Sequence, residues 1–443
     1  MCARIMVLFI GITLVLVGCT KEKMSHDPTE PNQDVTEVPV TPIVTDKFLG
    51  DIGELRITPY ARNLQSGFSV YSSPLRFDKW LERPTNKPEY GRIVAAGTSI
   101  EMIVIGGSLS AGVKDGGLSR EGQLGCYSNL VATQLGMIDF VTPVFEEPYS
   151  NGTGFDIRMN RSELFFNRVN NDLAILQAEA HGNPPVLRPF KGPNVSNFSV
   201  PWLTTWDIFA ATWDSTRIGK GVNAFGVSWA PFLPYAWRFV PRAHFEQGTF
   251  YQHIRKTQSY NFYLLEDRGD YFLNAIRMKR PISQGALLYD MKEGEYHTLR
   301  LIKMLSYAGQ KGVIMTVPRL RDLGITDWNV TVLNTNESQM YDTAVEINNG
   351  HFRKWAAEHD LALVDLENLY SDINNGRYTT EQGLKITGGL SGNFFSSDGI
   401  YPTTLGQAVI ANEVIKAINI QYNSKIPLVD IRSYMSTIGV SID

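Results

Sequence analysis

A serine lies at a turn between two expected elements, which is a position where a hydroxyl group can act as a nucleophile. The apolar run Met102–Ile105 predicts a short buried strand, and Gly106 and Gly107 allow a sharp turn into a helix. Ser108 follows this turn directly. A serine hydroxyl attacks an acyl carbonyl only when a base takes its proton and donors stabilise the oxyanion. Ser108 is therefore a candidate nucleophile, and a helix-capping role is the structural alternative.

The elements that would position Ser108 alternate between helix and strand. Apolar periodicity predicts four helices, near 127–135, 298–311, 341–359 and 404–422, the first of them amphipathic. Short apolar runs at 313–317 and 361–366 predict further strands. Strands that alternate with helices form parallel sheets covered on both faces. We therefore expect an α/β fold with three layers, α/β/α, around a parallel sheet.

The first residues of the sequence predict a lipid anchor. Arg4 precedes the apolar run Ile5–Val17, which is too short for a stable membrane span and is built like a secretory signal. The tetrapeptide L-V-G-C that ends at Cys19 resembles a lipobox, in which the cysteine thiol carries a lipid. An ordinary signal peptide with an incidental cysteine is the alternative. We expect a signal peptide at 1–18, and lipidated Cys19 with a flexible tether at 19–46.

The rest of the chain is divided into an extension at 47–91, packed on the main domain, and the main domain at 92–443. The main domain is expected to contain an insertion at about 140–255. Five of the eight tryptophans fall within this insertion, between Trp202 and Trp237. They form either an exposed binding surface or the core of an inserted subdomain, and the second interpretation is favoured.

Composition and charge exclude several kinds of function. A net charge of −4 and a pI near 6.0 provide no basic surface, so we expect no nucleic-acid partner. Of three cysteines, Cys2 and Cys19 belong to the signal region and Cys126 is left alone. The cysteine and histidine positions show no metal-ligand spacing. We expect no intrachain disulfide, no metal site and no cofactor.

Two motifs together resemble the SGNH (GDSL-type) hydrolase superfamily, and in particular its lipoprotein branch in Bacteroidota, over most of residues 92–434. The first family motif, G-[DN]-S-L-[ST]-x-G, is similar to Gly106–Gly112, which reads G-G-S-L-S-A-G. The last motif, D-G-[IV]-H-x-[TS]-x-x-G, is similar to Asp398–Gly406, which reads D-G-I-Y-P-T-T-L-G. The resemblance implies a flavodoxin-like fold and the site of a serine ester hydrolase.

The resemblance also implies that three catalytic positions are replaced. Asn197–Leu203 is similar to the second motif, N-[LF]-x-V-P-G-A, with Trp202 in place of a glycine that donates to the oxyanion. Phe262–Asp270 is similar to a strand that runs into G-N-N-D, with Gly269 in place of the catalytic asparagine. In the last motif Tyr401 replaces the histidine base, which the family aspartate, here Asp398, would orient.

These replacements predict a loss of catalysis. Ser108, its own N–H group and Asp398 are the catalytic groups that remain by this alignment. A phenol with its usual pKa near 10 can hydrogen-bond to Ser108 but accepts its proton poorly at neutral pH. Beyond the predicted tether, which contains His26, no histidine lies in a motif that would direct it toward Ser108; these histidines are His181, His244, His253, His297, His351 and His359. Loss of the base in a serine hydrolase lowers the rate by about 10⁶.

The sequence therefore predicts a catalytically inactive hydrolase-like protein that acts as a binding or scaffold subunit. We expect it to be lipid-anchored at the outer membrane, on the periplasmic or cell-surface face. The expected partners are the membrane itself and a β-barrel or other lipoproteins of that membrane. The alternative is an active serine esterase or acylhydrolase that cleaves carbohydrate or lipid esters with a rearranged site.

Overall fold

The computed structural model describes the main domain with gaps. The described residues are 75–83, 87–114, 117–145, 153–160, 163–169, 190–201, 203–210, 233–240, 249–257, 259–277, 284–324, 335–389, 391–396 and 398–442. They all belong to the unit Thr45–Asp443, and the other unit, Met1–Val44, lies outside them. The predicted signal peptide, lipidation at Cys19 and tether therefore lie outside the described residues, as does Trp202.

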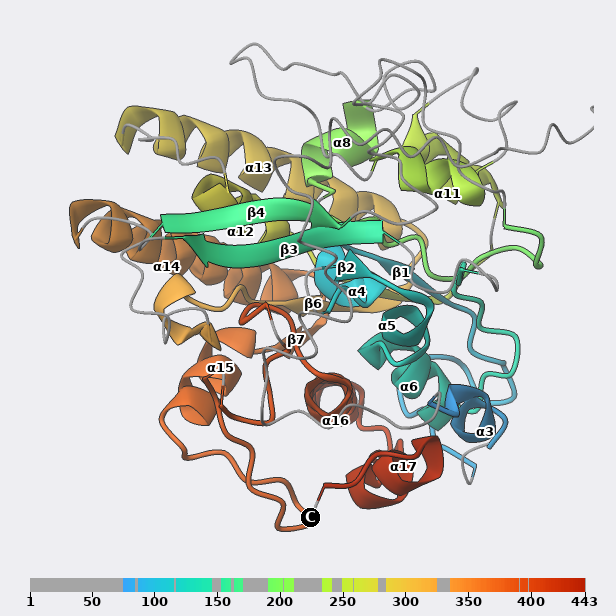
Figure 1. Ribbon diagram of the computed structural model, residues 1–443. Coiled ribbons are helices and arrows are strands. Elements are labelled where there is room, and N and C mark those ends of the chain that lie inside the picture. The colour runs from blue at the N-terminus through green and yellow to red at the C-terminus, as the bar shows by residue number, and fades with distance from the viewer. Residues whose placement is uncertain are drawn as a thin grey trace, which may run out of the picture. The chain divides into compact units, whose positions relative to one another are not determined.

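A four-stranded parallel sheet forms the centre of this unit (Figure 1). Its strands are β1 (Met102–Ile105), β5 (Phe262–Leu265), β6 (Lys311–Met315) and β7 (Ala362–Val364), in the order β1-β5-β6-β7. All residues of β1 and β5 are buried, which is typical of strands covered on both faces. The prediction of a parallel sheet built from short apolar runs is confirmed.

A further segment runs parallel to β1 along its free edge. The N–H of Val104 donates to the Ser196 carbonyl at 2.8 Å, and the N–H of Phe198 donates to the Val104 carbonyl at 2.8 Å. With this segment the order becomes 196–198, β1, β5, β6, β7, which is the doubly wound, flavodoxin-like order. The winding direction reverses between β1 and β5. The carboxyl ends of these two strands therefore form the switch point at which such folds bind ligands.

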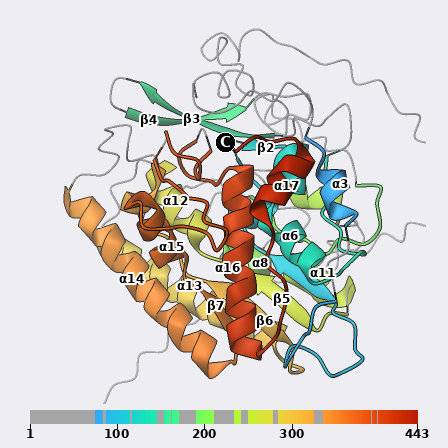
Figure 2. The same ribbon diagram turned by 90° about the horizontal axis from the view of Figure 1, so that it is seen from below.

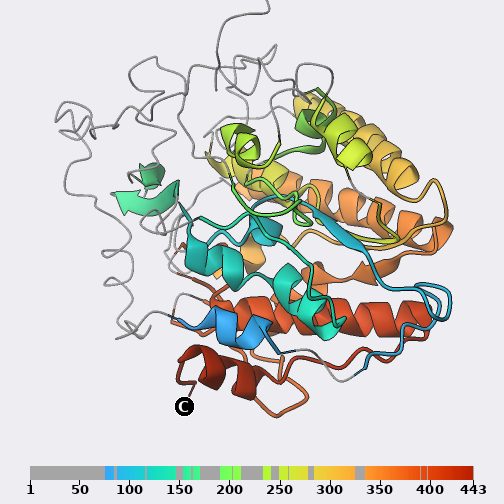
Figure 3. The same cartoon turned by 90° about the vertical axis from the view of Figure 1, so that its right-hand side faces the viewer.

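Helices cover both faces of the sheet. On one face α16 (Thr404–Tyr422) packs on β7 and β6 and beside α6 (Tyr127–Gln134). On the other face α14 (Thr335–Glu358) packs on the same strands, next to α13 (Gln284–Leu305). Figure 3 shows the red helix α16 and the orange helix α14 on opposite sides of the strands, and Figure 2 shows α16 crossing in front of them. The expected three layers, α/β/α, are confirmed.

The remaining elements are mostly short. The helices are α3 (Phe77–Leu81), α4 (Ser108–Ala111), α5 (Arg120–Leu124), α8 (Thr205–Ala210), α11 (Phe250–Thr257), α12 (Gly269–Arg277), α15 (Leu366–Asn374) and α17 (Ile431–Ile438), with 3₁₀ turns at Leu233–Arg238 and Leu320–Asp322. A second, antiparallel sheet has the order β2-β3-β4 and contains β2 (Gly117–Leu118), β3 (Thr153–Asn160) and β4 (Glu163–Val169). Among the described helices, none is long and apolar enough to cross a membrane.

The predicted and observed element bounds agree best where the apolar pattern is longest. The last helix has the predicted bounds, Thr404–Tyr422, whereas α13 begins at Gln284, well before the predicted 298. The prediction that 127–135 is amphipathic is wrong, because all residues of α6 are buried. This helix packs against both α16 and α3, so it has no face left for solvent.

Tyr422, at the end of α16, connects this helix to the amino ends of two strands. Its buried hydroxyl donates to the Gly312 carbonyl at 2.6 Å. The same oxygen accepts from the N–H groups of Gly312 at 3.1 Å and of Ala362 at 3.3 Å. One side chain therefore satisfies peptide groups of both β6 and β7.

The substitution Tyr422→Phe removes this hydroxyl and leaves buried peptide groups without a partner. We expect it to lower the free energy of unfolding by about 1–3 kcal/mol, as measured by urea denaturation. Tyr307→Phe is the matched control, because Tyr307 is 72% exposed, and it should change this free energy by less than about 0.5 kcal/mol. Equal effects of the two substitutions would contradict the role given to Tyr422.

Candidate functional site

Ser108 is the first residue of α4 and lies directly after the turn that ends β1. The helix has a single turn, because Gly112 at its end adopts a left-handed conformation with φ of 87°. Gly107 is the N-cap residue and makes no side-chain capping bond. Ser108 is completely buried. Ser108 is therefore not the N-cap residue, and its hydroxyl is bonded to a residue of another helix.

The partner of Ser108 is a carboxylate that sequence analysis did not select. Asp270, in the first turn of α12, accepts at Oδ2 from the N–H of Ser108 at 2.7 Å and from its hydroxyl at 2.8 Å. The other oxygen, Oδ1, accepts from the hydroxyl of Tyr401 at 2.9 Å. Asp270 is 3% exposed and Tyr401 5% exposed. Asp270 thus joins the first and last motifs in one buried cluster, as the resemblance implies for Ser108 and Tyr401.

This contact changes what the N–H group of Ser108 can do. Under the SGNH resemblance it is the oxyanion donor that the chain retains. In the structure it binds Oδ2 of Asp270, so a carboxylate oxygen takes the place that a substrate oxyanion would need. Oxyanion stabilisation requires donors that are free to point at the reacting carbonyl. In this arrangement the N–H of Ser108 points at Asp270.

A second carboxyl group holds the same turn. Glu266, directly after β5, accepts at Oε2 from the N–H of Gly107 at 2.8 Å and from the N–H of Ser110 at 3.3 Å. A Cβ atom at Gly107 would come into hard contact with Oδ2 of Asp270. The family motif has Asp or Asn at this position. Glycine at 107 therefore makes room for the Asp270 carboxylate beside Ser108.

Burial controls the protonation of this cluster. Burial, and then the charge of Asp270, raise the pKa of Glu266 to about 8. Burial also raises the pKa of Tyr401 and of Tyr127 well above the usual value, and Tyr127 shares a 2.6 Å hydrogen bond with Ser110. At neutral pH Glu266 is mostly protonated and both phenols are neutral. A neutral phenol at Tyr401 is a poor acceptor for the proton of Ser108.

Asp398 lies in the turn that carries Tyr401. Its Oδ1 accepts from the N–H groups of Ile400 and Tyr401, each at 2.8 Å, and it is 1% exposed. Gly399 adopts a φ of 67°, a left-handed conformation that glycine favours. The aspartate that would orient a histidine in the family here binds the backbone of its own turn.

Gly269 and Trp202 are the other two positions that the resemblance implies to be replaced. Gly269 is the first residue of α12 and contributes no side-chain donor; an added Cβ would lie 3.2 Å from Oε1 of Glu266. Trp202 lies outside the described residues. Its neighbour Val200 donates through its N–H to the carbonyl of Gly106 at 3.0 Å. The second motif thus runs beside the Ser108 turn, which is where the resemblance implies it.

No described histidine lines the pocket next to Ser108. The ring of His253 packs against Phe198 with the centroids 6.3 Å apart, and that of His297 packs against Trp206 at 5.0 Å. His351 lies 3.3 Å from Glu295. His359 directly follows α14, and His181 and His244 lie outside the described residues. The lining of this pocket thus contains no histidine among the described residues.

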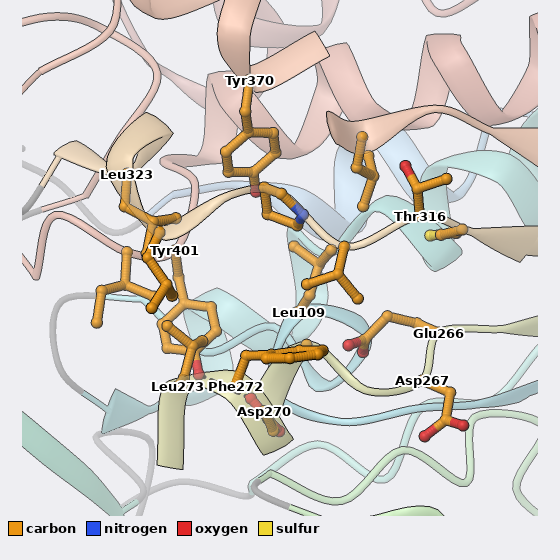
Figure 4. A pocket seen from close by; sticks show the side chains of 17 residues that line it. Leu109, Glu266, Asp267, Asp270, Phe272, Leu273, Thr316, Leu323, Tyr370 and Tyr401 are labelled. Atoms are coloured by element: carbon orange, nitrogen blue, oxygen red, sulfur yellow. Dashed lines mark hydrogen bonds between the residues drawn. The ribbon is translucent and has the colours of Figure 1, made fainter. Parts of the chain in front are cut away.

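A largely apolar pocket adjoins this cluster at the carboxyl ends of β5 and β6 (Figure 4). Its cavity volume is about 40 Å³. Its apolar lining includes Leu109, Phe272, Leu273, Met315, Val317 and Leu323. Glu266 and Asp270 lie on one side of it. In the described part of the chain, no three His, Cys, Asp or Glu side chains are arranged to hold a metal ion.

Comparisons with known proteins add little beyond this geometry. No protein-family model matches the sequence, and no curated protein is similar to it. Among solved structures, the chain is similar to an alpha/beta hydrolase enzyme from the metagenome of Lake Arreo, Spain, at 14% identity and a TM-score of 0.35. That similarity covers 75% of this chain and 99% of the other. A similarity at this level carries no argument about activity.

Asp270 and Glu266 are the site residues that sequence reasoning missed. They lie in the run E-D-R-G-D directly after β5, and the carboxyl ends of β1 and β5 are neighbours in the sheet. Two acids after a fully buried strand, next to the strand that precedes Ser108, were the available signal.

The raised pKa of Glu266 predicts a pH-dependent stability. The folded chain keeps this proton up to about pH 8, whereas an ordinary glutamate loses it near pH 4.5. Because the folded state binds more protons in this interval, the free energy of unfolding should fall as pH rises from about 4.5 to about 8. Glu266→Gln cannot titrate, so this part of the decline, on the order of a few kcal/mol, should be lost.

Urea denaturation below and above this pH interval measures the effect. Glu358→Gln is the control, because Glu358 is an exposed acid on α14 that faces Lys354, and it should keep the decline of the unchanged protein. A decline that is the same in the Glu266→Gln variant as in the unchanged protein would show that Glu266 is not its source.

Proposed function

We propose that the protein is a catalytically inactive member of the SGNH hydrolase fold that acts as a lipid-anchored binding or scaffold subunit at the outer membrane. The observation that carries this proposal is the Asp270 carboxylate, which binds both the N–H and the hydroxyl of Ser108. At the N–H of Ser108 the carboxylate occupies the place of a substrate oxyanion. At the hydroxyl it binds the group that would act as the nucleophile.

Three physical arguments support the loss of catalysis. Tyr401, in place of the histidine base, is a buried neutral phenol that donates its proton to Asp270. The N–H of Ser108 is occupied, and loss of one oxyanion donor costs about 3 kcal/mol of transition-state stabilisation. Ser108 is completely buried. Loss of the base adds about 8 kcal/mol, although such losses are not additive.

The binding role is supported by what the fold retains. A pocket lies at the switch point of the sheet. The turns that carry Ser108 and Tyr401, which would hold a catalytic site, also contribute lining residues. The outer-membrane location and a β-barrel or lipoprotein partner are part of the proposal. They are supported by the lipobox-like sequence at Cys19 and by the resemblance to the Bacteroidota lipoprotein branch.

Labelling with a fluorophosphonate serine probe tests the loss of catalysis. We expect the purified protein to react no faster than its Ser108→Ala variant, because Ser108 has no base and is held by Asp270. A cooperative melting transition in the same sample would confirm that the protein is folded. Stoichiometric labelling that disappears in Ser108→Ala would overturn the proposal.

One contact favours the alternative of an active serine esterase. Oδ2 of Asp270 lies 2.8 Å from the hydroxyl of Ser108, which is within reach for proton transfer. If the protein is labelled, Asp270→Asn should abolish the labelling, and Asp270 would then be the base.

The lipid anchor is tested with an alkyne analogue of palmitate fed to cells that express the full chain. We expect the protein to carry the label and to enter the detergent phase in a phase-separation assay, because acyl chains on Cys19 would hold it at the membrane. The Cys19→Ser variant should lose the label. Cys126→Ser is the matched control, because Cys126 is a buried free thiol, and it should keep the label. Equal labelling of the Cys19→Ser variant would contradict the anchor.

A further inference from the structure

The pocket beside Ser108 has charged lining residues of a single sign. Among its described lining residues, Glu266, Asp267 and Asp270 are acidic, and no lysine, arginine or histidine is present. Glu266 is 7% exposed and makes no ion pair in the described part of the chain. These acids accept from backbone N–H and hydroxyl groups, and no lining residue adds a positive charge to offset a carboxylate. The pocket therefore favours a positively charged ligand over a negative one.

Tyr370 gives an independent indication of a ligand. It projects from α15 toward the pocket, lines it, and is 3% exposed (Figure 4). Its hydroxyl makes no hydrogen bond within the described part of the chain, although burial and the charges of Glu266 and Asp398 raise the pKa of this phenol. The hydroxyl of Tyr370 is available to a bound molecule.

Aromatic rings complete the lining. Phe272, Tyr370 and Tyr401 contribute rings, and Leu273 and Val317 contribute aliphatic side chains. The faces of aromatic rings attract cations, most strongly where water is excluded. An apolar body would bury its surface against the aliphatic part of the lining. The combination fits a molecule with one positive charge and a hydrocarbon part.

We propose that this pocket binds a small apolar amine in its ammonium form, held beside the carboxyl groups of Glu266 and Asp270 and the hydroxyl of Tyr370. Its hydrocarbon part lies against Phe272, Leu273 and Val317. This inference rests on the proposed function, because it assigns the ligand of the same site in a protein that does not turn it over.

Binding of a cation here must release a proton. Glu266, with a pKa of about 8, is mostly protonated at neutral pH in the empty pocket, and a neighbouring positive charge favours its ionised form. The other groups that interact with Glu266 are Asp270 from α12, Tyr127 from α6 and Tyr370 from α15. Burial keeps both phenols neutral. The proton therefore comes from the coupled pair of Glu266 and Asp270.

Isothermal titration calorimetry of the full chain tests this with hexylamine, hexanol and hexanoate, which share one chain length and differ in charge. Titrations at neutral pH in two buffers of different ionisation enthalpy give the number of protons released. We expect hexylamine to bind with release of close to one proton. Hexanol should bind about tenfold more weakly and release none, and hexanoate should bind more weakly still.

Two variants assign the contacts. Glu266→Gln should weaken hexylamine binding about tenfold or more and abolish proton release, because it removes the charge and the proton together. Tyr370→Phe removes one hydroxyl, so it should weaken binding about fivefold and leave proton release unchanged. Glu358→Gln, on the exposed face of α14, is the control and should change neither quantity.

Several outcomes would overturn the inference: hexanol or hexanoate binding as tightly as hexylamine, amine binding without proton release, or no amine binding by protein with a cooperative melting transition. Labelling of Ser108 keeps the two proposals separate. Labelled protein that binds amine would overturn the non-catalytic role alone, whereas unlabelled protein that does not bind amine would overturn this inference alone.

Discussion

A carboxylate without access to water must find its hydrogen-bond donors inside the protein, and Asp270 finds them on segments far apart in sequence. The turn after β1 supplies the N–H and hydroxyl of Ser108, and the turn before α16 supplies the hydroxyl of Tyr401. The rest of the site depends on this interaction. It keeps Ser108 in place, and the charge of Asp270 contributes to the neutral state of Glu266.

The two ends of the sheet have different roles. At the amino ends of β6 and β7, Tyr422 satisfies peptide groups that would otherwise be buried without partners. At the carboxyl ends, the turns after β1 and β5 bring Ser108, Glu266 and Asp270 together around a pocket. A doubly wound sheet places its ligand site at this second end, because the connecting helices leave the sheet in opposite directions there.

Much of the fold was predictable from the sequence, because short apolar runs and long periodic helices such as Thr404–Tyr422 report burial directly. The contiguous motifs also predicted that Ser108 and Tyr401 lie at one site, and both residues bind Asp270. The role of Asp270 was not predictable in the same way, because it depends on a side chain entering space left open by Gly107 on a distant segment. The full burial of α6 likewise depends on tertiary packing against α16 and α3.

The residue types that fit at positions 107 and 270 depend on each other. A side chain at 107, such as the Asp or Asn of the SGNH motif, would collide with the carboxylate of Asp270. Removing Asp270 would take one acceptor away from the hydroxyl of Tyr401 and from both donors of Ser108. Substitutions at these two positions are therefore expected to be coupled. In evolutionary terms the two residues are epistatic, because the side chain that position 107 tolerates depends on the side chain at position 270.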